Sequence, residues 1–112
     1  TAIGNDISYD DVFSFQLEGR ITSRDLLLVV SSSGNSRNIL KAIEVAKENS
    51  AETIAFCGFD GGEAKEKADY CIHVPANNYG IVEDIHQSLM HSIAQYLRLD
   101  NTRDFKFGMT FI

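Results

Sequence analysis

An unbroken apolar run at residues 26–30 leads directly into a hydroxyl-rich turn and then into a helical pattern. The run, Leu-Leu-Leu-Val-Val, is typical of a parallel strand that is buried on both faces. After the turn, apolar residues at three- and four-residue spacing predict a helix; they are Ile39, Leu40, Ile43 and Ala46. A strand, a short turn and a helix in this order direct backbone N–H groups and the positive end of the helix dipole at whatever lies above the turn.

The turn itself concentrates side chains that hold anions. Its candidate ligand-binding residues are Ser31, Ser32, Ser33, Asn35 and Ser36. Gly34 lets the backbone approach a ligand closely. Taken singly, these residues are equally well explained as a helix cap, with Ser36 or Asn35 as the capping residue. A cap needs only one hydroxyl, however, so the presence of four favours a phosphate site.

The rest of the chain alternates between apolar runs and helical segments. Strands are expected at residues 25–31, 51–57 and 70–74, and helices at 36–49, 63–68 and 81–97. This alternation predicts right-handed parallel crossovers and a doubly wound α/β sheet, with the glycine-rich turn 58–62 close to the serine turn. Nearer the N-terminus, a short amphipathic helix is expected to open at Asp10 and Asp11 and to end at Gly19, burying Phe13 and Leu17.

Composition excludes several classes of partner. The 112 residues, 44% of them hydrophobic, are enough for one domain with a core. A net charge of −6, without a basic cluster, argues against binding to nucleic acid or to an anionic membrane, and no apolar run is long enough for a membrane span. Cys57 and Cys71 lie in apolar runs without metal-ligand spacing, so we expect buried, reduced thiols in a cytoplasmic protein rather than a disulfide.

The expected helix at 81–97 carries a polar face beside its apolar stripe. Glu83, Gln87 and His91 are four residues apart and therefore stack along one side of the helix. A carboxylate and an imidazole on such a face are suited to hold a divalent metal or to act as an acid/base pair. The spacing by itself is more often that of a solvated helix surface, and it leaves both explanations open.

Four motifs in register resemble the sugar isomerase (SIS) domain and, within it, the phosphoheptose isomerase branch. They are Gly4-Asn5-Asp6, the serine turn from Val30 to Ser36, the turn from Gly58 to Gly62, and Ile85-His86 with His91. The resemblance runs from about Gly4 to Leu99 and implies that residues 1–99 form the C-terminal portion of a SIS domain. In the family, a helical arm, a strand with a glycine-rich phosphate loop, and a helix with a catalytic glutamate and histidine precede this portion. The chain does not begin with Met, which fits either a processed protein or a piece of a longer one.

The resemblance also implies an activity and a set of site residues. It suggests an isomerase that interconverts an aldose and a ketose phosphate through an enediol, with sedoheptulose 7-phosphate or a related sugar as substrate. The serine turn would hold the phosphate and His91 would transfer a proton. Asp6 would contact the sugar, although the preference of Asn and Asp for turns explains this residue equally well. Some family members bind zinc, with Glu83 and His91 as the matching ligands here, although position 83 is usually a glutamine in the family. His86 matches a family histidine without an agreed role, and we expect it, like His73, to be structural.

Two other functions remain open from the sequence, and so does the assembly. A non-catalytic SIS module that binds a sugar phosphate in a regulator or assembly factor would keep the serine turn and lose the chemistry. An unrelated receiver-like domain is less well supported, because it needs acidic residues where this chain has serines. Family members form active sites between subunits, which implies a homo-oligomer, a tetramer. The period-2 aromatic tail at residues 100–112 is expected to pack on a partner subunit or over the neighbouring helix.

Overall fold

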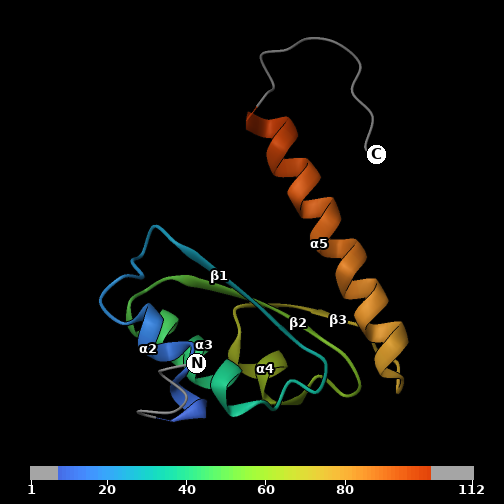
Figure 1. The fold of residues 1–112 in the computed structure, drawn as a ribbon, viewed down its shortest axis with the longest axis horizontal. Coiled ribbons are helices and arrows are strands. Elements are labelled where there is room, and N and C mark those ends of the chain that lie inside the picture. Colours follow the sequence, from blue (N-terminus) through green and yellow to red (C-terminus); the bar gives the residue numbers. More distant parts are fainter. Residues whose placement is uncertain (1–7, 102–112) are drawn as a thin grey trace.

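The computed structural model describes residues 8–101 of the chain (Figure 1). In chain order the elements are the 3-10 helix η1 (Tyr9–Asp11), α2 (Ser14–Leu17), β1 (Leu26–Ser31), α3 (Arg37–Glu48), β2 (Glu52–Cys57), α4 (Gly62–Lys67), β3 (Tyr70–His73) and α5 (Tyr79–Asn101). The predicted sugar contact Asp6 lies outside the described residues. The predicted tail overlaps them only at residues 100–101, which continue α5.

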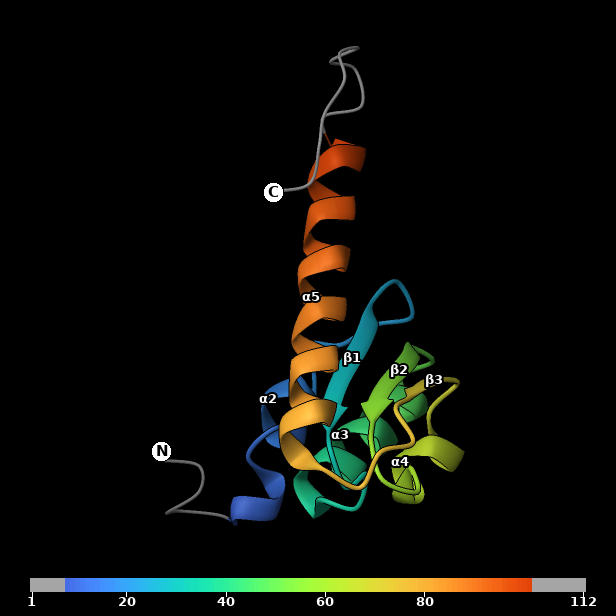
Figure 2. The same ribbon diagram turned by 90° about the vertical axis from the view of Figure 1, so that its right-hand side faces the viewer.

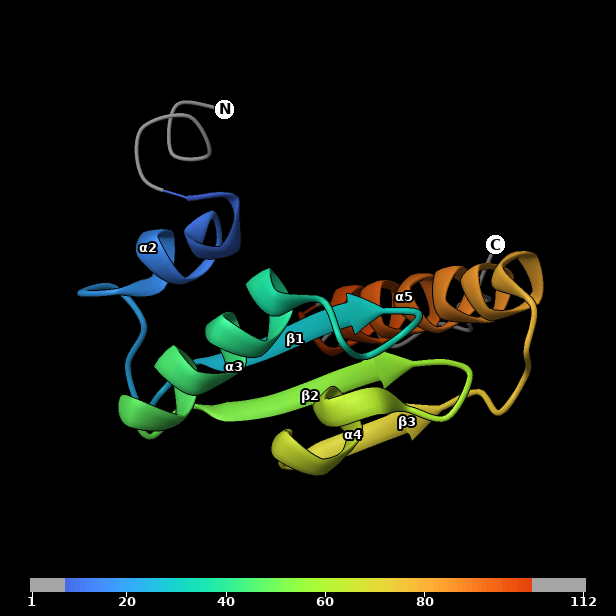
Figure 3. The same ribbon diagram turned by 90° about the horizontal axis from the view of Figure 1, so that it is seen from below.

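The three strands form one parallel sheet in the order β1-β2-β3. Helices α3 and α4 lie on one face of this sheet, and α5 lies on the other (Figures 1 and 3). The parallel α/β architecture predicted from the alternation of strands and helices is therefore confirmed. Because β1 and β2 pair in register up to Ser31 and Cys57, the turns that follow these two strands leave the sheet side by side.

The main core forms between the sheet and α3. Val29 and Ala55 project from the strands against Leu40 and Ile43 of α3, and Ile43 is completely buried. The helix presents its apolar stripe to the sheet and its charged residues to solvent, as its three- and four-residue spacing predicts. An ion pair between Lys41 and Asp11, with 2.8 Å between nitrogen and oxygen, connects the solvent side of α3 to η1.

Coverage of the sheet is uneven, and here the prediction of a strand buried on both faces is wrong for β1. Leu26, Leu28 and Val30 are between 36% and 56% exposed. The reason is the course of α5, which packs on the end of β2 through His86 and then projects away from the sheet (Figures 1 and 2). Within that contact, Val82 is fully buried and lies where a side chain at Gly58 would stand. The unbroken apolar run thus predicts more burial of β1 than the described residues provide.

The segment before β1 also differs from its prediction. Two short helices, η1 and α2, replace the single helix expected from Asp10 to Gly19, with a break at Val12 and Phe13. The break changes which residues face inward: Val12 and Ser14 are buried, while Phe13 is 43% exposed. Apolar spacing relates the buried residues of a segment only along one continuous helix, and the break between η1 and α2 removes that phase relation.

Reciprocal hydrogen bonds between Asp69 and Thr53 connect the start of β3 to the start of β2. The Asp69 carboxylate accepts hydrogen bonds from the Thr53 amide (2.9 Å) and hydroxyl (3.1 Å), and the Thr53 hydroxyl accepts one from the Asp69 amide (2.9 Å). Thr53 is completely buried, so its polar groups depend on this partner. These two donors from Thr53, first the backbone amide and then the hydroxyl, lower the pKa of Asp69 below its ordinary value.

We expect the hydrogen bonds between Asp69 and Thr53 to make the free energy of unfolding fall as the solution becomes acidic. A carboxyl whose pKa is lowered by folding contributes stability that is fully present above its unfolded pKa and is lost as the pH falls through the folded pKa. The difference in unfolding free energy between the wild type and Asp69→Asn should therefore shrink as the pH is taken from 7 to below 4. Urea unfolding of both full-length proteins over this pH range measures it, and a constant difference would contradict the assignment.

Candidate functional site

The serine turn after β1 and the glycine turn after β2 interlock at the carboxyl edge of the sheet, as predicted. The Gly58 amide donates to the carbonyl oxygen of Ser32 (2.8 Å), and the Ala64 amide donates to that of Gly34 (2.9 Å). The Glu63 amide donates to the side-chain oxygen of Asn35 (3.0 Å). Asn35 thereby supplies an acceptor to the first turn of α4, so the oxygen of this predicted ligand residue has a structural partner.

Backbone packing between the two turns requires glycine. Gly34 has a φ of +71°, and a Cβ atom on it would overlap the carbonyl oxygen of Gly61. Gly62 has a φ of +57°, and a Cβ atom there would meet the carbonyl oxygen of Ser33. The positive φ angles and the close approach explain why these positions cannot carry a side chain without moving a turn.

Two serine hydroxyls build the turn as hydrogen-bond acceptors. The buried Ser31 hydroxyl accepts from the Gly34 amide (3.1 Å) and lies 3.5 Å from the Ser36 hydroxyl. The Ser33 hydroxyl accepts from the Asn35 amide (3.2 Å). An accepting hydroxyl keeps its own O–H for donation, so these side chains can shape the turn and still donate to an anion.

Ser36 stands at the N-cap of α3, but its hydroxyl makes no capping hydrogen bond to the first turn. The simpler explanation of the serines, that they cap this helix, therefore does not account for Ser36. In the first turn the Ile39 amide is bonded to the side chain of Asn38 (2.8 Å). The helix is 12 residues long, and its positive dipole end faces the same turn as the serine hydroxyls. The combination provides the donors of an anion site.

A cavity of about 320 Å³ lies between the serine turn and α5. It is lined by Val30, Ser32, Glu83, His86, Gln87 and Met90. The structure thus brings Ser32 from the predicted phosphate turn to the same cavity as two members of the polar face of α5. A small polar ligand held at the serine turn would extend toward a carboxylate and an amide on the helix.

His91, the predicted catalytic residue, is not among the residues that line this cavity. It is exposed and lies one helical turn beyond Gln87, whose side-chain amide donates to its Nε2 atom (3.2 Å). This contact leaves the proton of the neutral imidazole on Nδ1. His91 therefore contacts a residue that lines the cavity, Gln87, but does not line the cavity itself. Its catalytic role remains a prediction.

His86 is the residue of this cavity that the sequence analysis placed only in a structural role. It is 1% exposed, its Nε2–H donates to the carbonyl oxygen of Cys57 (3.0 Å), and its ring lies 5.8 Å from that of Phe56. Its Nδ1 atom is buried without a hydrogen-bond partner. Burial and packing agree with a structural role, yet His86 also lines the cavity. His86 does not share the four-residue spacing of Glu83, Gln87 and His91. Its position in the sequence therefore gave no sign that it would line the cavity.

The residues proposed as metal ligands do not by themselves complete a zinc site. Glu83 and His91 are eight residues apart, which is about 12 Å along a helix axis. Among residues 8–101 no group of three or more His, Cys, Asp or Glu side chains is arranged to hold a metal ion. Zinc in proteins takes three or four protein ligands. The described residues therefore do not fit zinc unaided, and we derive no chemical step through a metal.

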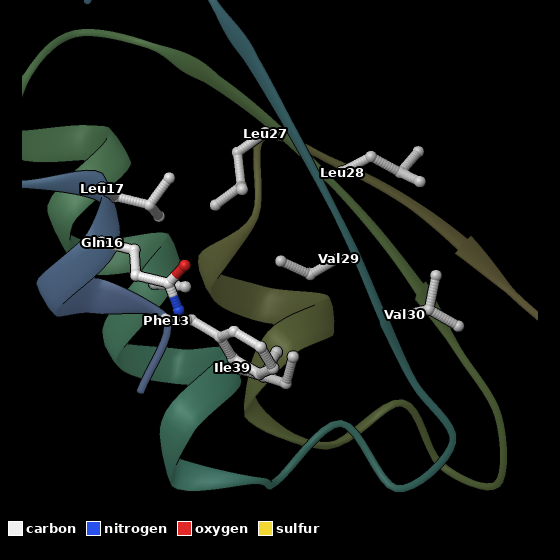
Figure 4. Close-up of a pocket in the computed structure, with 9 residues that line it drawn as sticks. Phe13, Gln16, Leu17, Leu27, Leu28, Val29, Val30 and Ile39 are labelled. Carbon is white, nitrogen blue, oxygen red and sulfur yellow. The ribbon is translucent and has the colours of Figure 1, made fainter. Parts of the chain in front are cut away.

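A second cavity, of about 360 Å³, runs along the outer edge of β1 (Figure 4). Figure 4 shows Phe13 and Leu17 of the N-terminal segment facing Leu27 and Val29 of the strand across it. Gln16, the polar side chain in its wall, already donates to the carbonyl oxygen of Val12 (2.6 Å). Its apolar lining offers nothing to a phosphate, whereas the cavity beside α5 is lined by Ser32 of the serine turn and is therefore the candidate ligand site.

No helix within the described part of the chain has both the length and the apolarity needed to cross a membrane.

Two curated proteins with similar sequences are named phosphoheptose isomerase. The one from Akkermansia muciniphila is 44% identical over 95 residues, covering 85% of this chain and 50% of the relative. The one from Aliarcobacter butzleri is 40% identical over 97 residues, covering 87% of this chain and 51% of the relative. The chain spans about half the length of the curated relatives it matches.

Solved structures show the same similarity in three dimensions. Phosphoheptose isomerase from Neisseria gonorrhoeae superposes with a TM-score of 0.80 at 34% identity, over 84% of this chain and 54% of that one. A phosphoheptose isomerase from Francisella tularensis gives a TM-score of 0.75 at 30% identity, over 84% and 51% of the two chains. The model of the SIS domain family matches residues 6–100. These residues contain the whole sheet, both interlocked turns and nearly all of α5, and the chain therefore belongs to the SIS domain family.

Proposed function

We propose that this chain is the phosphate-binding portion of a sugar-phosphate isomerase. The observation that carries the proposal is the meeting of the serine turn with the polar face of α5 at one cavity, through Ser32, Glu83 and Gln87. The names of the similar proteins support an isomerase rather than a non-catalytic module. We further propose sedoheptulose 7-phosphate, or a closely related ketose phosphate, as the substrate.

Phosphate binding follows from the donors at the serine turn. Hydroxyl groups and the N-terminus of α3 hold a dianion through dipoles and hydrogen bonds, so the net charge of −6 is no obstacle. Hydrogen bonds to a charged group are stronger than those between neutral groups. A phosphate fixed at one end of the substrate orients the reacting carbons at the other end, which is how binding energy remote from the reaction lowers its barrier.

The chemistry proposed for the other end of the cavity is proton transfer through an enediol. A base removes the proton from the carbon next to the carbonyl group and returns it to the neighbouring carbon, while a second group moves the hydroxyl proton. We propose His91 as one of these two groups. Gln87 holds the Nε2 atom of His91, and this contact orients the imidazole on the exposed side of α5. The second group would come from residues beyond this chain.

Turnover of the full-length protein tests the activity. Incubation with sedoheptulose 7-phosphate should yield the isomeric aldose phosphate, which NMR spectroscopy detects, and deuterium from heavy water should enter at the carbon that exchanges its proton. Binding of the sugar phosphate without turnover or deuterium incorporation would contradict the isomerase and favour the binding module. Absence of binding would contradict both.

Removal of the Ser32 hydroxyl tests the site. We expect Ser32→Ala to weaken binding of the sugar phosphate by about 1–3 kcal/mol, because a charged acceptor loses a donor. Isothermal titration of the full-length variant measures the change. The matched control is Ser23→Ala, which removes an exposed hydroxyl in the loop before β1. Equal affinities for the two variants would contradict the placement of phosphate at the serine turn.

We propose that the protein assembles as a homotetramer. Apolar side chains remain exposed along α5 in this single chain; they are Ile81, Ile85, Ile93, Tyr96 and Leu97. A helix that presents so much apolar surface is typical of one that packs against further protein. The tetramer itself is carried by the resemblance to the family, in which active sites form between subunits.

A further inference from the structure

The two cysteines of the chain lie against each other on neighbouring strands of the sheet. Cys57 ends β2 and Cys71 belongs to the neighbouring strand β3, and their sulfur atoms are 2.8 Å apart. Both are free thiols. Cys57 is completely buried, whereas Cys71 is partly exposed on β3, which is an edge strand of the sheet in the described residues. One member of the pair can therefore meet a small solute while the other cannot.

The environment of Cys57 keeps its thiol protonated. Burial, with a further contribution from the contact with Cys71, raises the pKa of Cys57 to about 12. A protonated Cys57 keeps its S–H, so it can donate a weak hydrogen bond to the sulfur of Cys71. The sequence contains no third cysteine that could compete for either partner.

We propose that Cys57 and Cys71 form a reversible oxidation site, in which a peroxide converts the paired thiols into an intrachain disulfide. This inference goes beyond the proposed isomerase activity and does not depend on it. The partly exposed Cys71 sulfur attacks the peroxide, which gives a sulfenic acid and, from hydrogen peroxide, one water. The Cys57 sulfur then attacks the sulfur of Cys71, the S–S bond forms, and the departing hydroxide takes the Cys57 proton as a second water. Two thiols lose two electrons in total, and one peroxide gains them.

The geometry favours the second step over further oxidation. A disulfide bond is about 2.05 Å long, so the two sulfur atoms need to approach by less than about 1 Å. A high pKa makes Cys57 a slow nucleophile toward reagents in solution. Cys71, however, holds its sulfenic acid directly against Cys57, and proximity of this kind replaces a bimolecular encounter.

The position of the pair places the new bond beneath the candidate ligand site. Cys57 is the register partner of Ser31, and its carbonyl oxygen accepts the hydrogen bond from His86. The next residue, Gly58, donates its amide to the carbonyl oxygen of Ser32. The oxidised residue would thus belong to the strand end that supports the serine turn, which makes this site suited to report the redox state of its surroundings.

Peptide mapping of the full-length protein tests the proposal. After treatment with hydrogen peroxide and alkylation of the remaining thiols, trypsin cleaves at Lys47, Lys65, Lys67 and Arg98 and places the two cysteines on separate peptides, residues 48–65 and 68–98. We expect a linked pair of these peptides, lighter by two hydrogens than their sum. Dithiothreitol added before alkylation should abolish the linked pair.

Single variants separate the two roles. In Cys57→Ser, Cys71 should pass to sulfinic acid because no partner is present to resolve it. In Cys71→Ser, the buried Cys57 should stay reduced under the same treatment. Accumulation of sulfinic acid at Cys71 of the wild type without the linked peptide would overturn the proposal. So would a wild type in which both thiols remain open to alkylation after denaturation. Both of these measurements use the wild type, so they decide the question even if a variant fails to fold.

Discussion

Replacing Gly34 with alanine is expected to lower the free energy of unfolding by more than about 4 kcal/mol, or to prevent folding altogether. The new methyl group would overlap the carbonyl of Gly61, which is backbone and cannot rotate away as a side chain can. The φ of +71° adds the cost of a left-handed conformation for a residue with a side chain. Separating the two turns would also break the hydrogen bond from the Ala64 amide to Gly34.

Gly19→Ala is the matched control for this substitution. Gly19 has almost the same φ, +75°, but a Cβ atom there would meet no other atom within 4 Å. Its expected cost is therefore the backbone term alone, about 1–2 kcal/mol. Urea unfolding of both full-length variants measures the difference between them. Equal losses would show that the close approach of the serine and glycine turns does not constrain Gly34.

Replacing His91 with alanine should lower kcat by roughly 10²–10⁴-fold, the typical effect of removing an acid or base group. The unfolding free energy should change little, because His91 is exposed and makes its side-chain hydrogen bond to an exposed neighbour, Gln87. Affinity for the sugar phosphate should also be nearly unchanged, since the phosphate is held at the serine turn. Steady-state kinetics, urea unfolding and isothermal titration of the full-length protein measure the three quantities separately.

Ser92→Ala controls for a change of the helix surface at the next position. Its hydroxyl donates to the carbonyl oxygen of Ser88 within α5 (3.0 Å) and has no proposed part in the reaction. We expect wild-type kcat for this variant. If kcat of His91→Ala also stayed within a few-fold of the wild type, another group would have to transfer the proton. The cavity residue Glu83 would then be the next candidate, because it already lines the ligand site.

Local sequence patterns were sufficient for the elements that form the sheet and its main helices. The apolar runs at 26–30 and 51–57 each became a strand, and the apolar spacing after the serine turn became α3. Both the parallel sheet and the meeting of the serine and glycine turns follow from strands that alternate with helices, because such strands share one carboxyl edge. The helical period gave the wrong buried residues for the short segment of η1 and α2, and the apolar run of β1 predicted more burial than the strand has.

Three features of the site were decided by the tertiary structure. Spacing placed Glu83, Gln87 and His91 on one face of a helix, but the docking of α5 through Val82 and His86 determined that the first two line the cavity and the third does not. The same docking left one face of β1 exposed, although the apolar residues on that face predict burial. The sulfur contact between Cys57 and Cys71 depends on strand register, which their separation of 14 residues does not reveal. Periodicity fixes which side of an element a residue occupies, whereas packing between elements fixes what that side meets.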